Sequence, residues 1–223
     1  RGPLAGPVLA AAVVLDPDHP IEGLDDSKKL SPRRRGELFD IIGRRARAVA
    51  VSAAGPREIE RINILRASLR AMATAVARLA VPVDYLLIDG NQPLSLDLPQ
   101  APIVSGDSLC ASIAAASIVA KVLRDRLMER LDRRFPRYGF ARHKGYPTRE
   151  HIAALRLHGP CHLHRRTYSG VAISPGHQGK RPLSMAEGRR GEEAACRFDV
   201  VLVETTEDGK PRAKDIIWDA FRL

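Results

Sequence analysis

Two aspartates, Asp89 and Asp107, are the residues in this sequence best suited to chemistry. Each follows a short apolar run that predicts a strand, and each lies beside a glycine. Because functional sites in open α/β sheets collect at strand ends, the two carboxylates are expected to share hard divalent cations such as Mg²⁺, which prefer oxygen ligands. The structural alternative is that each aspartate only caps a turn, as Asp beside Gly often does.

Two polar segments could bind phosphate groups. In residues 139–148 (GFARHKGYPT), Lys144 can pair with a phosphate, and Tyr146 can stack on a sugar or base or can pack as a lid on the core. In residues 25–29 (DDSKK), Lys28 and Lys29 either contact phosphate or belong to a polar turn before a helix. Neither segment decides between its two interpretations by itself.

Histidine and cysteine spacing gives no metal motif. His162 and His164 lie two residues apart without a third ligand nearby, so we interpret them as surface residues. The three cysteines, Cys110, Cys161 and Cys196, are far apart, which predicts neither a disulfide framework nor a paired metal site. A reducing compartment fits this cysteine usage.

The charge of the chain favours a polyanionic partner. Its 223 residues carry a formal net charge of +10, and a basic surface of this kind attracts nucleic acid. Simple solubility as a basic protein is the alternative. No apolar run reaches the roughly 18 residues of a membrane span, and the first residues lack a signal-peptide pattern. We therefore expect no membrane association and a cytoplasmic location.

Apolar patterning predicts alternating strands and helices. Strands are expected at 8–15, 48–53, 85–88 and 103–104, and helices from Ser31-Pro32, over 65–79, over 113–131 and from Thr148 to Gly159. The face of the second helix is expected to consist of Leu65, Leu69, Met72, Val76 and Leu79. This order predicts an α/β sheet layered with helices over one domain, residues 1–172. Residues 173–185 are typical of a linker, and residues 186–223, with a strand-like run at 200–203, are too few to fold alone.

Several ordered blocks carry a resemblance to a known family. They are RGPLAGPV at 1–8, DSKKLS at 26–31, DGN at 89–91, GDS at 106–108, SIAAASIVAKVLRDRLM at 112–128, HKGYPT at 143–148 and HRRTY at 164–168. Together they resemble the bacterial type 2 ribonuclease H family, ribonuclease HII. The resemblance implies a ribonuclease H-like mixed sheet flanked by helices, with a helical C-terminal part.

The resemblance also implies an activity. The family consists of endonucleases that cut the RNA strand of RNA–DNA hybrids and single ribonucleotides in duplex DNA, with 5′-phosphate and 3′-hydroxyl products. It uses a two-metal site for Mg²⁺ or Mn²⁺ and serves DNA replication and repair. Asp89 and Asp107 correspond to two of its four carboxylates, which makes them both metal ligands and catalytic residues. We expect a monomer that binds hybrids and ribonucleotide-containing duplexes.

Substrate contacts follow from the same resemblance. Arg1 and Gly2 correspond to the end of a Gly-Arg-Gly motif whose backbone recognises the ribose 2′-hydroxyl, and Tyr146 corresponds to a tyrosine that cooperates in this recognition. Lys28, Lys29 and Lys144 are the expected phosphate contacts. Leu109-Cys110 departs from the pattern, because relatives often carry Lys or Arg there, and this departure weakens a phosphate contact without touching a metal ligand.

The other two family carboxylates form an Asp-Glu pair just before the Gly-Arg-Gly motif. The sequence starts at the Arg of that motif, so we expect the 223-residue polypeptide by itself to be inactive or nearly so. Two rival functions stay open: a catalytically incomplete fragment that only binds nucleic acid, and another two-metal nuclease or resolvase of the same fold.

The tail carries a weaker resemblance. Residues 188–195 and 196–201 and the closing residues 219–221 resemble the two ends of the YraN-type family, whose acidic nuclease motif lies in the part that has no counterpart here. A fused reading frame joined near Ala195-Cys196 is one interpretation, and an unrelated disordered tail is the other. No second active site is expected.

Overall fold

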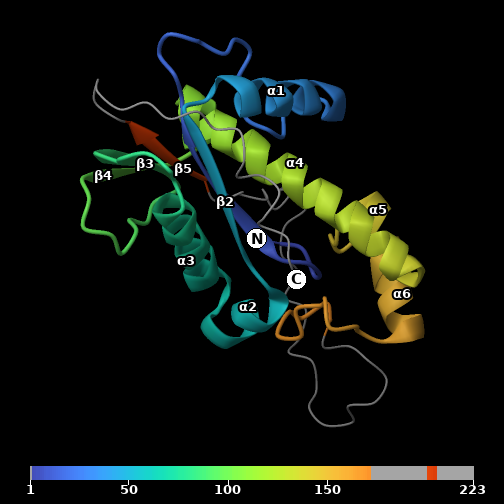
Figure 1. The fold of residues 1–223 in the computed structure, drawn as a ribbon. Coiled ribbons are helices and arrows are strands. Elements are labelled where there is room, and N and C mark those ends of the chain that lie inside the picture. Colours follow the sequence, from blue (N-terminus) through green and yellow to red (C-terminus); the bar gives the residue numbers. More distant parts are fainter. Residues whose placement is uncertain (1, 172–199, 205–223) are drawn as a thin grey trace. The chain divides into compact units, whose positions relative to one another are not determined.

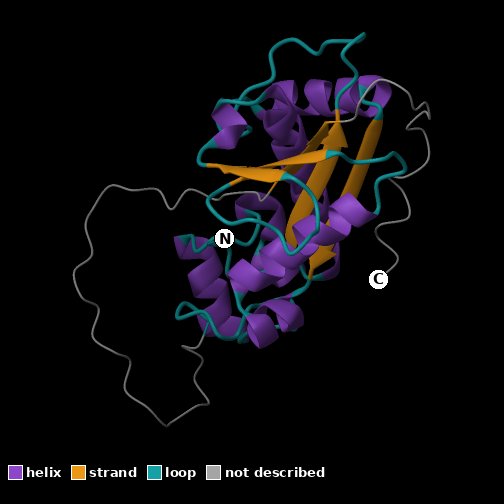
Figure 2. Cartoon of the chain, turned by 90° about the vertical axis from the view of Figure 1, so that its left-hand side faces the viewer, coloured by secondary structure: helices purple, strands orange, loops and turns teal. Residues whose placement is uncertain are grey.

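The computed structural model describes residues 2–171 and 200–204 and divides into two compact units. Of the described residues, the sheet unit comprises Val8–Ala54, Ile62–Arg124 and Val200–Glu204, and the helical unit comprises residues 2–7, Gly55–Arg61 and residues 125–171. All the strands of the described residues belong to the sheet unit, as the orange arrows in Figure 2 show.

The sheet is five-stranded and mixed. Its strands are β1 (Val8–Val14), β2 (Ala48–Ala54), β3 (Tyr85–Asp89), β4 (Gln100–Ile103) and β5 (Val200–Glu204), in the order β2-β1-β5-β3-β4. β1 runs antiparallel to β2 and parallel to β5, whereas β3 runs antiparallel to β5 and parallel to β4. This arrangement confirms the expected α/β class with a mixed sheet.

The predicted strands were found, with one shift. All seven residues of β1 are buried, as its continuous apolar run predicts for a strand covered on both faces. The strand expected at 103–104 instead ends at Ile103, and Val104 is 56% exposed. The prediction was wrong there because β4 pairs with β3 through the less apolar residues Gln100–Ile103. After β4, Ser105 takes a left-handed conformation (φ 57°) that turns the chain into the next element.

Helices cover the sheet of this unit on both sides (Figure 1). α1 (Pro32–Arg45) begins at Ser31, whose hydroxyl accepts a hydrogen bond from Arg34 N at 3.2 Å, so the predicted cap is confirmed. α3 (Ile64–Ala77) packs against β1 and β2. The buried residues of α3 are Ala67, Ser68, Ala71, Met72, Ala75 and Val76. Of the expected apolar face, Met72 and Val76 are buried, whereas the leucines are only half-buried, so the prediction was partly right. The small side chains of α3 let the helix lie close to the sheet and take the buried positions instead.

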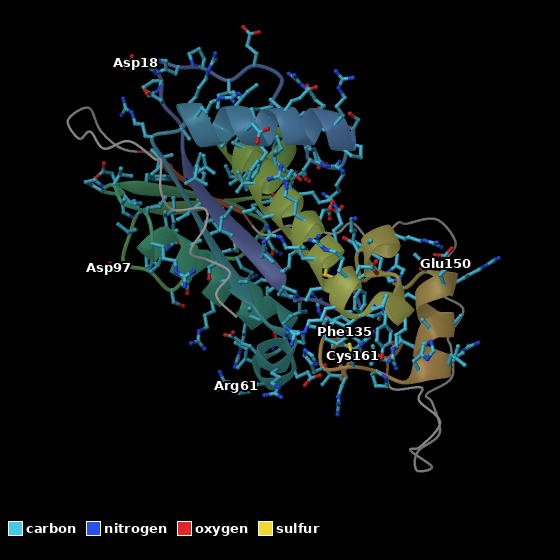
Figure 3. The ribbon with its side chains drawn as sticks, turned by 45° about the vertical axis from the view of Figure 1, so that its right-hand side comes forward. Asp18, Arg61, Asp97, Phe135, Glu150 and Cys161 are labelled. Carbon is cyan, nitrogen blue, oxygen red and sulfur yellow. The ribbon has the colours of Figure 1, made fainter. Side chains whose placement is uncertain are left out.

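The helical unit contains α2 (Pro56–Ile62, whose last residue belongs to the sheet unit), α5 (Phe140–His143), α6 (Arg149–His158) and the second part of α4 (Ala111–Arg134). The sequence predicted α4 and α6 but not α2 or α5. Thr148 caps α6 by accepting from His151 N at 3.2 Å, and the helix ends at Gly159, as expected. The core of this unit is a cluster of Ala5, Met128, Tyr138 and Phe140, and Phe135 and Cys161, labelled in Figure 3, pack against it.

Of the tail, the structure describes only β5, which confirms the strand-like run expected at 200–203. The expected linker at 173–185, the proposed join at Ala195-Cys196 and the rest of residues 186–223 lie outside the described residues. The limits of the three predicted segments therefore stay predictions. Within residues 2–171 and 200–204, no helix has the length and apolar character needed to cross a membrane.

Candidate active site

The two aspartates of the sheet unit lie at the same edge of the sheet. Asp89 is the last residue of β3, and Asp107 lies in the short 3-10 helix Gly106–Ser108 that follows the parallel strand β4. The backbone N of Gly106 donates to Asp89 Oδ1 at 2.9 Å, so the turn that carries Asp107 is tied directly to Asp89. Both aspartates are buried, with 5% and 6% of their surface exposed. The geometry is the one expected for a shared site, and their role as metal ligands stays a prediction.

Gly106 allows this turn to approach the helix that follows it. A Cβ atom at this position would lie 2.5 Å from Ile113 Cδ1 and 3.4 Å from Ile103 Cβ. A side chain at this position would require the Ile113 side chain to shift, so the glycine leaves room for the turn beside α4. The Gly106 N–H of this turn is the group that holds Asp89 Oδ1.

A lysine neutralises part of this carboxylate charge. Lys28 Nζ lies 3.4 Å from Asp107 Oδ2 and 3.6 Å from Asp26 Oδ1. Its turn is anchored by Ser27, whose buried hydroxyl lies 2.9 Å from the buried Ser117 hydroxyl of α4. Residues 26–28 therefore lie fixed beside Asp107, and their contact with phosphate stays a prediction. Lys29 instead pairs with Asp25 at 3.2 Å on an exposed surface.

The electrostatics of Asp107 suit a cation. Burial raises the pKa of its carboxyl group, and the nearby Lys28 ammonium opposes this rise. Asp89 and Asp107 therefore offer oxygen ligands that fit a hard cation, but within residues 2–171 no three His, Cys, Asp or Glu side chains are grouped so that they could hold a metal ion. Leu109, next to this turn, is 70% exposed, in the position where a phosphate contact was expected to be weakened.

The remaining predicted site residues belong to the helical unit, except Arg1, which lies outside the described residues. Leu4 N donates to Gly145 O at 2.8 Å, which joins the segment of Gly2 to the segment of Tyr146. Gly145 has φ +87°, and a Cβ there would lie 2.5 Å from Ala5 O, so only glycine fits this contact. A Cβ on Gly2 would meet nothing within 4 Å, which leaves its backbone open to a ligand.

Lys144 and Tyr146 differ in whether the side chain already has a partner that accounts for its position in the fold. Lys144 Nζ binds Glu129 Oε1 at 2.7 Å, and its side chain is 18% exposed, so this ammonium already has an acidic partner. Tyr146 is half-buried, which is compatible with a lid on the core and with a ring that packs on a sugar. Its phosphate-binding or sugar-binding role therefore stays a prediction.

Sequence reasoning missed a cluster of buried histidines in the helical unit. His143, His151 and His164 are buried, so the expectation that His164 lies at the surface was wrong, whereas His162 is exposed as expected. The missed signal is a spacing of four residues between His151 and Leu155, which places both on the buried face of α6. The described cysteines, Cys110 and Cys161, are free thiols.

Comparison with known proteins identifies the family and supports the fold. The sequence profile of ribonuclease HII matches residues 1–171. The chain is 58% identical to the ribonuclease HII of Geobacter metallireducens, a match that covers 77% of this chain and 80% of that protein, and 56% identical to ribonuclease HII 1 of Methylibium petroleiphilum, covering 77% and 86%. Among solved structures, ribonuclease H2 from Pyrococcus horikoshii OT3 matches with a TM-score of 0.65 at 24% identity, covering 77% of this chain and 91% of that one, which supports the fold. The chain belongs to the ribonuclease HII family.

Proposed function

We propose that this chain provides the Asp89–Asp107 part of the active site of an endonuclease that acts on the RNA strand of RNA–DNA hybrids and on single ribonucleotides in duplex DNA. The observation that carries the proposal is the hydrogen bond from Gly106 N to Asp89 Oδ1, which brings two buried carboxylates to one sheet edge. A turn-capping role would not require both carboxylates to be buried together. Membership of the ribonuclease HII family supports the same activity.

The proposed cofactor is Mg²⁺ or Mn²⁺. Asp89 and Asp107 would hold it, because they are buried oxygen ligands, and the Lys28 ammonium beside Asp107 Oδ2 indicates that positive charge is favoured there. Two such ions, when bound, supply the activation of water and the charge stabilisation that phosphodiester hydrolysis to 5′-phosphate and 3′-hydroxyl ends requires.

The other proposed roles concern substrate binding. Lys28 and Lys29 would neutralise phosphate charge beside the aspartates, and Lys144 would do so in the helical unit after exchanging its Glu129 partner. The open backbone of Gly2 and the ring of Tyr146 would contact the ribose, whose 2′-hydroxyl distinguishes RNA from DNA. We further propose that the protein is a cytoplasmic monomer active in replication and repair.

We also propose that cleavage needs an acidic pair in addition to Asp89 and Asp107. The family resemblance implies an Asp-Glu pair in positions that precede Arg1, and two aspartates alone are too few carboxylates to hold two divalent cations close together. The 223-residue polypeptide by itself is therefore expected to bind hybrids but to cut them at least about a hundredfold more slowly than the same polypeptide joined to an N-terminal segment that carries Asp-Glu-Gly.

A cleavage panel tests this proposal. Both polypeptides are compared with Mg²⁺ on an RNA–DNA hybrid, a duplex with one ribonucleotide, an all-DNA duplex and four-way junction DNA. The extended polypeptide should cut only the first two, with 5′-phosphate ends. Cleavage of junction DNA would instead support a resolvase of the same fold. Equal rates for the two polypeptides would show that Asp89 and Asp107 suffice.

A further inference from the structure

The buried histidines of the helical unit form a continuous hydrogen-bonded chain. Cys161 N lies 3.0 Å from His164 Nδ1, His164 Nε2 lies 3.0 Å from His151 Nε2, and His151 Nδ1 lies 2.8 Å from Tyr146 O. His151 and His164 are 0% and 1% exposed. This series of hydrogen bonds therefore runs through the interior of the unit and ends on the backbone carbonyl of Tyr146.

The backbone N–H of Cys161 fixes which atom donates in each of these hydrogen bonds. A backbone N–H can only donate, so His164 Nδ1 accepts from Cys161 and a neutral His164 carries its proton on Nε2. That proton is donated to His151 Nε2, which leaves the proton of a neutral His151 on Nδ1. His151 then donates to Tyr146 O. This is the single neutral arrangement in which each of the three contacts has one donor and one acceptor.

Contacts of His143 also hold the backbone of this segment. Tyr146 N donates to His143 O at 2.8 Å, and Gly145 N lies 3.1 Å from His143 Nδ1. A neutral His143 therefore carries its proton on Nε2, which donates to Tyr138 O at 2.7 Å. The rings of His143 and His151 stack with their centroids 4.3 Å apart, so the two histidines support each other beside the Tyr146 segment.

We propose that His151, held in its orientation by His164, is a positioning residue that fixes the backbone of Tyr146 and thereby its ring for recognition of the ribonucleotide. The inference rests on the proposed role of Tyr146 in sugar recognition. A half-buried ring costs conformational entropy to order when the substrate binds, and a backbone fixed beforehand reduces that cost.

The arrangement works only while both histidines are neutral. A proton added to His151 would place an N–H on Nε2 against the N–H of His164, with two donors and no acceptor at 3.0 Å. Burial, together with the nearby histidines, lowers the pKa of both side chains to about 4, so the neutral chain persists at neutral pH.

Two substitutions of His151 separate positioning from packing. In His151→Asn, the amide nitrogen lies near the place of Nδ1 and can still donate to Tyr146 O, whereas in His151→Gln the amide lies near the place of Nε2 and serves only His164. Tyr146→Ala gives the effect expected when the ring is lost. His158→Gln is the matched control, because His158 is an exposed histidine of the same helix.

The readout is the ratio of Kd values for an all-DNA duplex and for the same duplex with one ribonucleotide, measured without divalent metal so that no cleavage occurs. We expect the unchanged chain, His151→Asn and His158→Gln to share one ratio, and His151→Gln and Tyr146→Ala to lower it by about tenfold. A lowered ratio for Tyr146→Ala with an unchanged ratio for a folded His151→Gln would overturn the inference alone. An unchanged chain without any preference would overturn the proposed role of Tyr146 and the inference with it.

A second measurement does not depend on substrate or on the stability of a variant. Long-range ¹H–¹⁵N NMR of the histidine rings in the full 223-residue chain at pH 7 should show the proton on Nδ1 of His151 and on Nε2 of His164. The opposite tautomer of either ring, or a charged ring, would overturn the inference. If His151→Gln fails to fold, a folded His151→Asn decides the binding test. A Kd ratio equal to that of the unchanged chain supports positioning, and a lowered Kd ratio contradicts it.

Discussion

The buried aspartates of the sheet unit and the buried histidines of the helical unit differ in how the protein compensates for removing a polar side chain from water. Asp107 keeps a carboxylate oxygen only 3.4 Å from a lysine and has a raised pKa, so its burial is incompletely compensated by the protein. His151 and His164 are neutral and use both ring nitrogens within the chain. This difference is the one expected if the first region accepts a further ligand, as proposed, and the second holds a fixed backbone.

The largest effect is expected at the proposed metal site of the sheet unit. In the polypeptide joined to an Asp-Glu-Gly segment, Asp89→Asn should lower the cleavage rate at least about a hundredfold while leaving hybrid binding largely intact, because an amide ligates Mg²⁺ poorly but can still accept from Gly106 N. Single-turnover cleavage and a binding titration measure the two effects. Asp97→Asn, at an exposed loop position labelled in Figure 3, is the control. Retention of more than about a tenth of the rate would remove Asp89 from the metal site.

The two regions should respond to acid with opposite signs. His151 and His164 have a pKa of about 4 in the folded chain against an ordinary histidine value of 6.5, so their contribution to stability is complete above pH 6.5 and is lost as the pH falls toward 4. Asp107 has a raised pKa, so its protonation favours the folded chain at low pH. We expect the histidines to dominate between pH 6.5 and 4, with a loss of roughly 3 kcal/mol in the free energy of unfolding for each histidine that becomes protonated.

Urea unfolding at a series of pH values measures this loss. The other titratable groups that face the pair are His143, His162, Cys161 and Tyr138. A His151→Asn variant should show a shallower pH dependence, whereas His158→Gln should follow the unchanged chain. A pH dependence that is identical in all three proteins would contradict the assignment.

A smaller loss of stability is expected from Gly145→Ala. The added Cβ would lie 2.5 Å from Ala5 O in a backbone with φ +87°, so we expect a loss of about 2 kcal/mol or more in the free energy of unfolding. Gly36→Ala is the matched control, because its Cβ would meet nothing within 4 Å inside helix α1 and should stabilise by up to about 1 kcal/mol. Equal effects of the two substitutions in thermal unfolding would show that the contact with Ala5 is not restrictive.

Tyr146→Ala separates recognition from packing. In the extended polypeptide it should lower cleavage of a duplex with one ribonucleotide by about tenfold, with little change in binding to all-DNA duplex, which depends on Lys and Arg contacts to phosphate. Tyr146→Phe keeps the ring and should retain most of the rate. If the activity loss only follows a large drop in melting temperature, the ring is a lid on the core.

The smallest effect on stability is expected from Gly2→Ala. Its Cβ would meet no atom within 4 Å, so the free energy of unfolding should change by less than about 0.5 kcal/mol. The methyl group should nevertheless hinder the approach of a ribose to the backbone and lower the preference for a ribonucleotide a few fold. A Kd ratio equal to that of the unchanged chain would remove Gly2 from the proposed site.

The sequence by itself determined the elements that have strong local signals, and it singled out Asp89 and Asp107 as the candidate site residues. β1 follows from an uninterrupted apolar run, α1 and α6 from Ser31 and Thr148 as caps, and Asp89 and Asp107 from strand ends beside glycines. These signals are local, since a few neighbouring residues specify each one.

Only the tertiary structure decided the partners of these residues. The placement of β5 between β1 and β3, the contact of Lys28 with Asp107 and the pairing of His151 with His164 all join residues that are distant in the sequence. The pattern of single residues does not encode such contacts, because the same histidine is suited to a solvated surface or to a buried hydrogen-bonded chain. The burial of His164 is settled by the surrounding Tyr138, Phe140 and His151 rings, which exclude water and leave each ring nitrogen a protein partner.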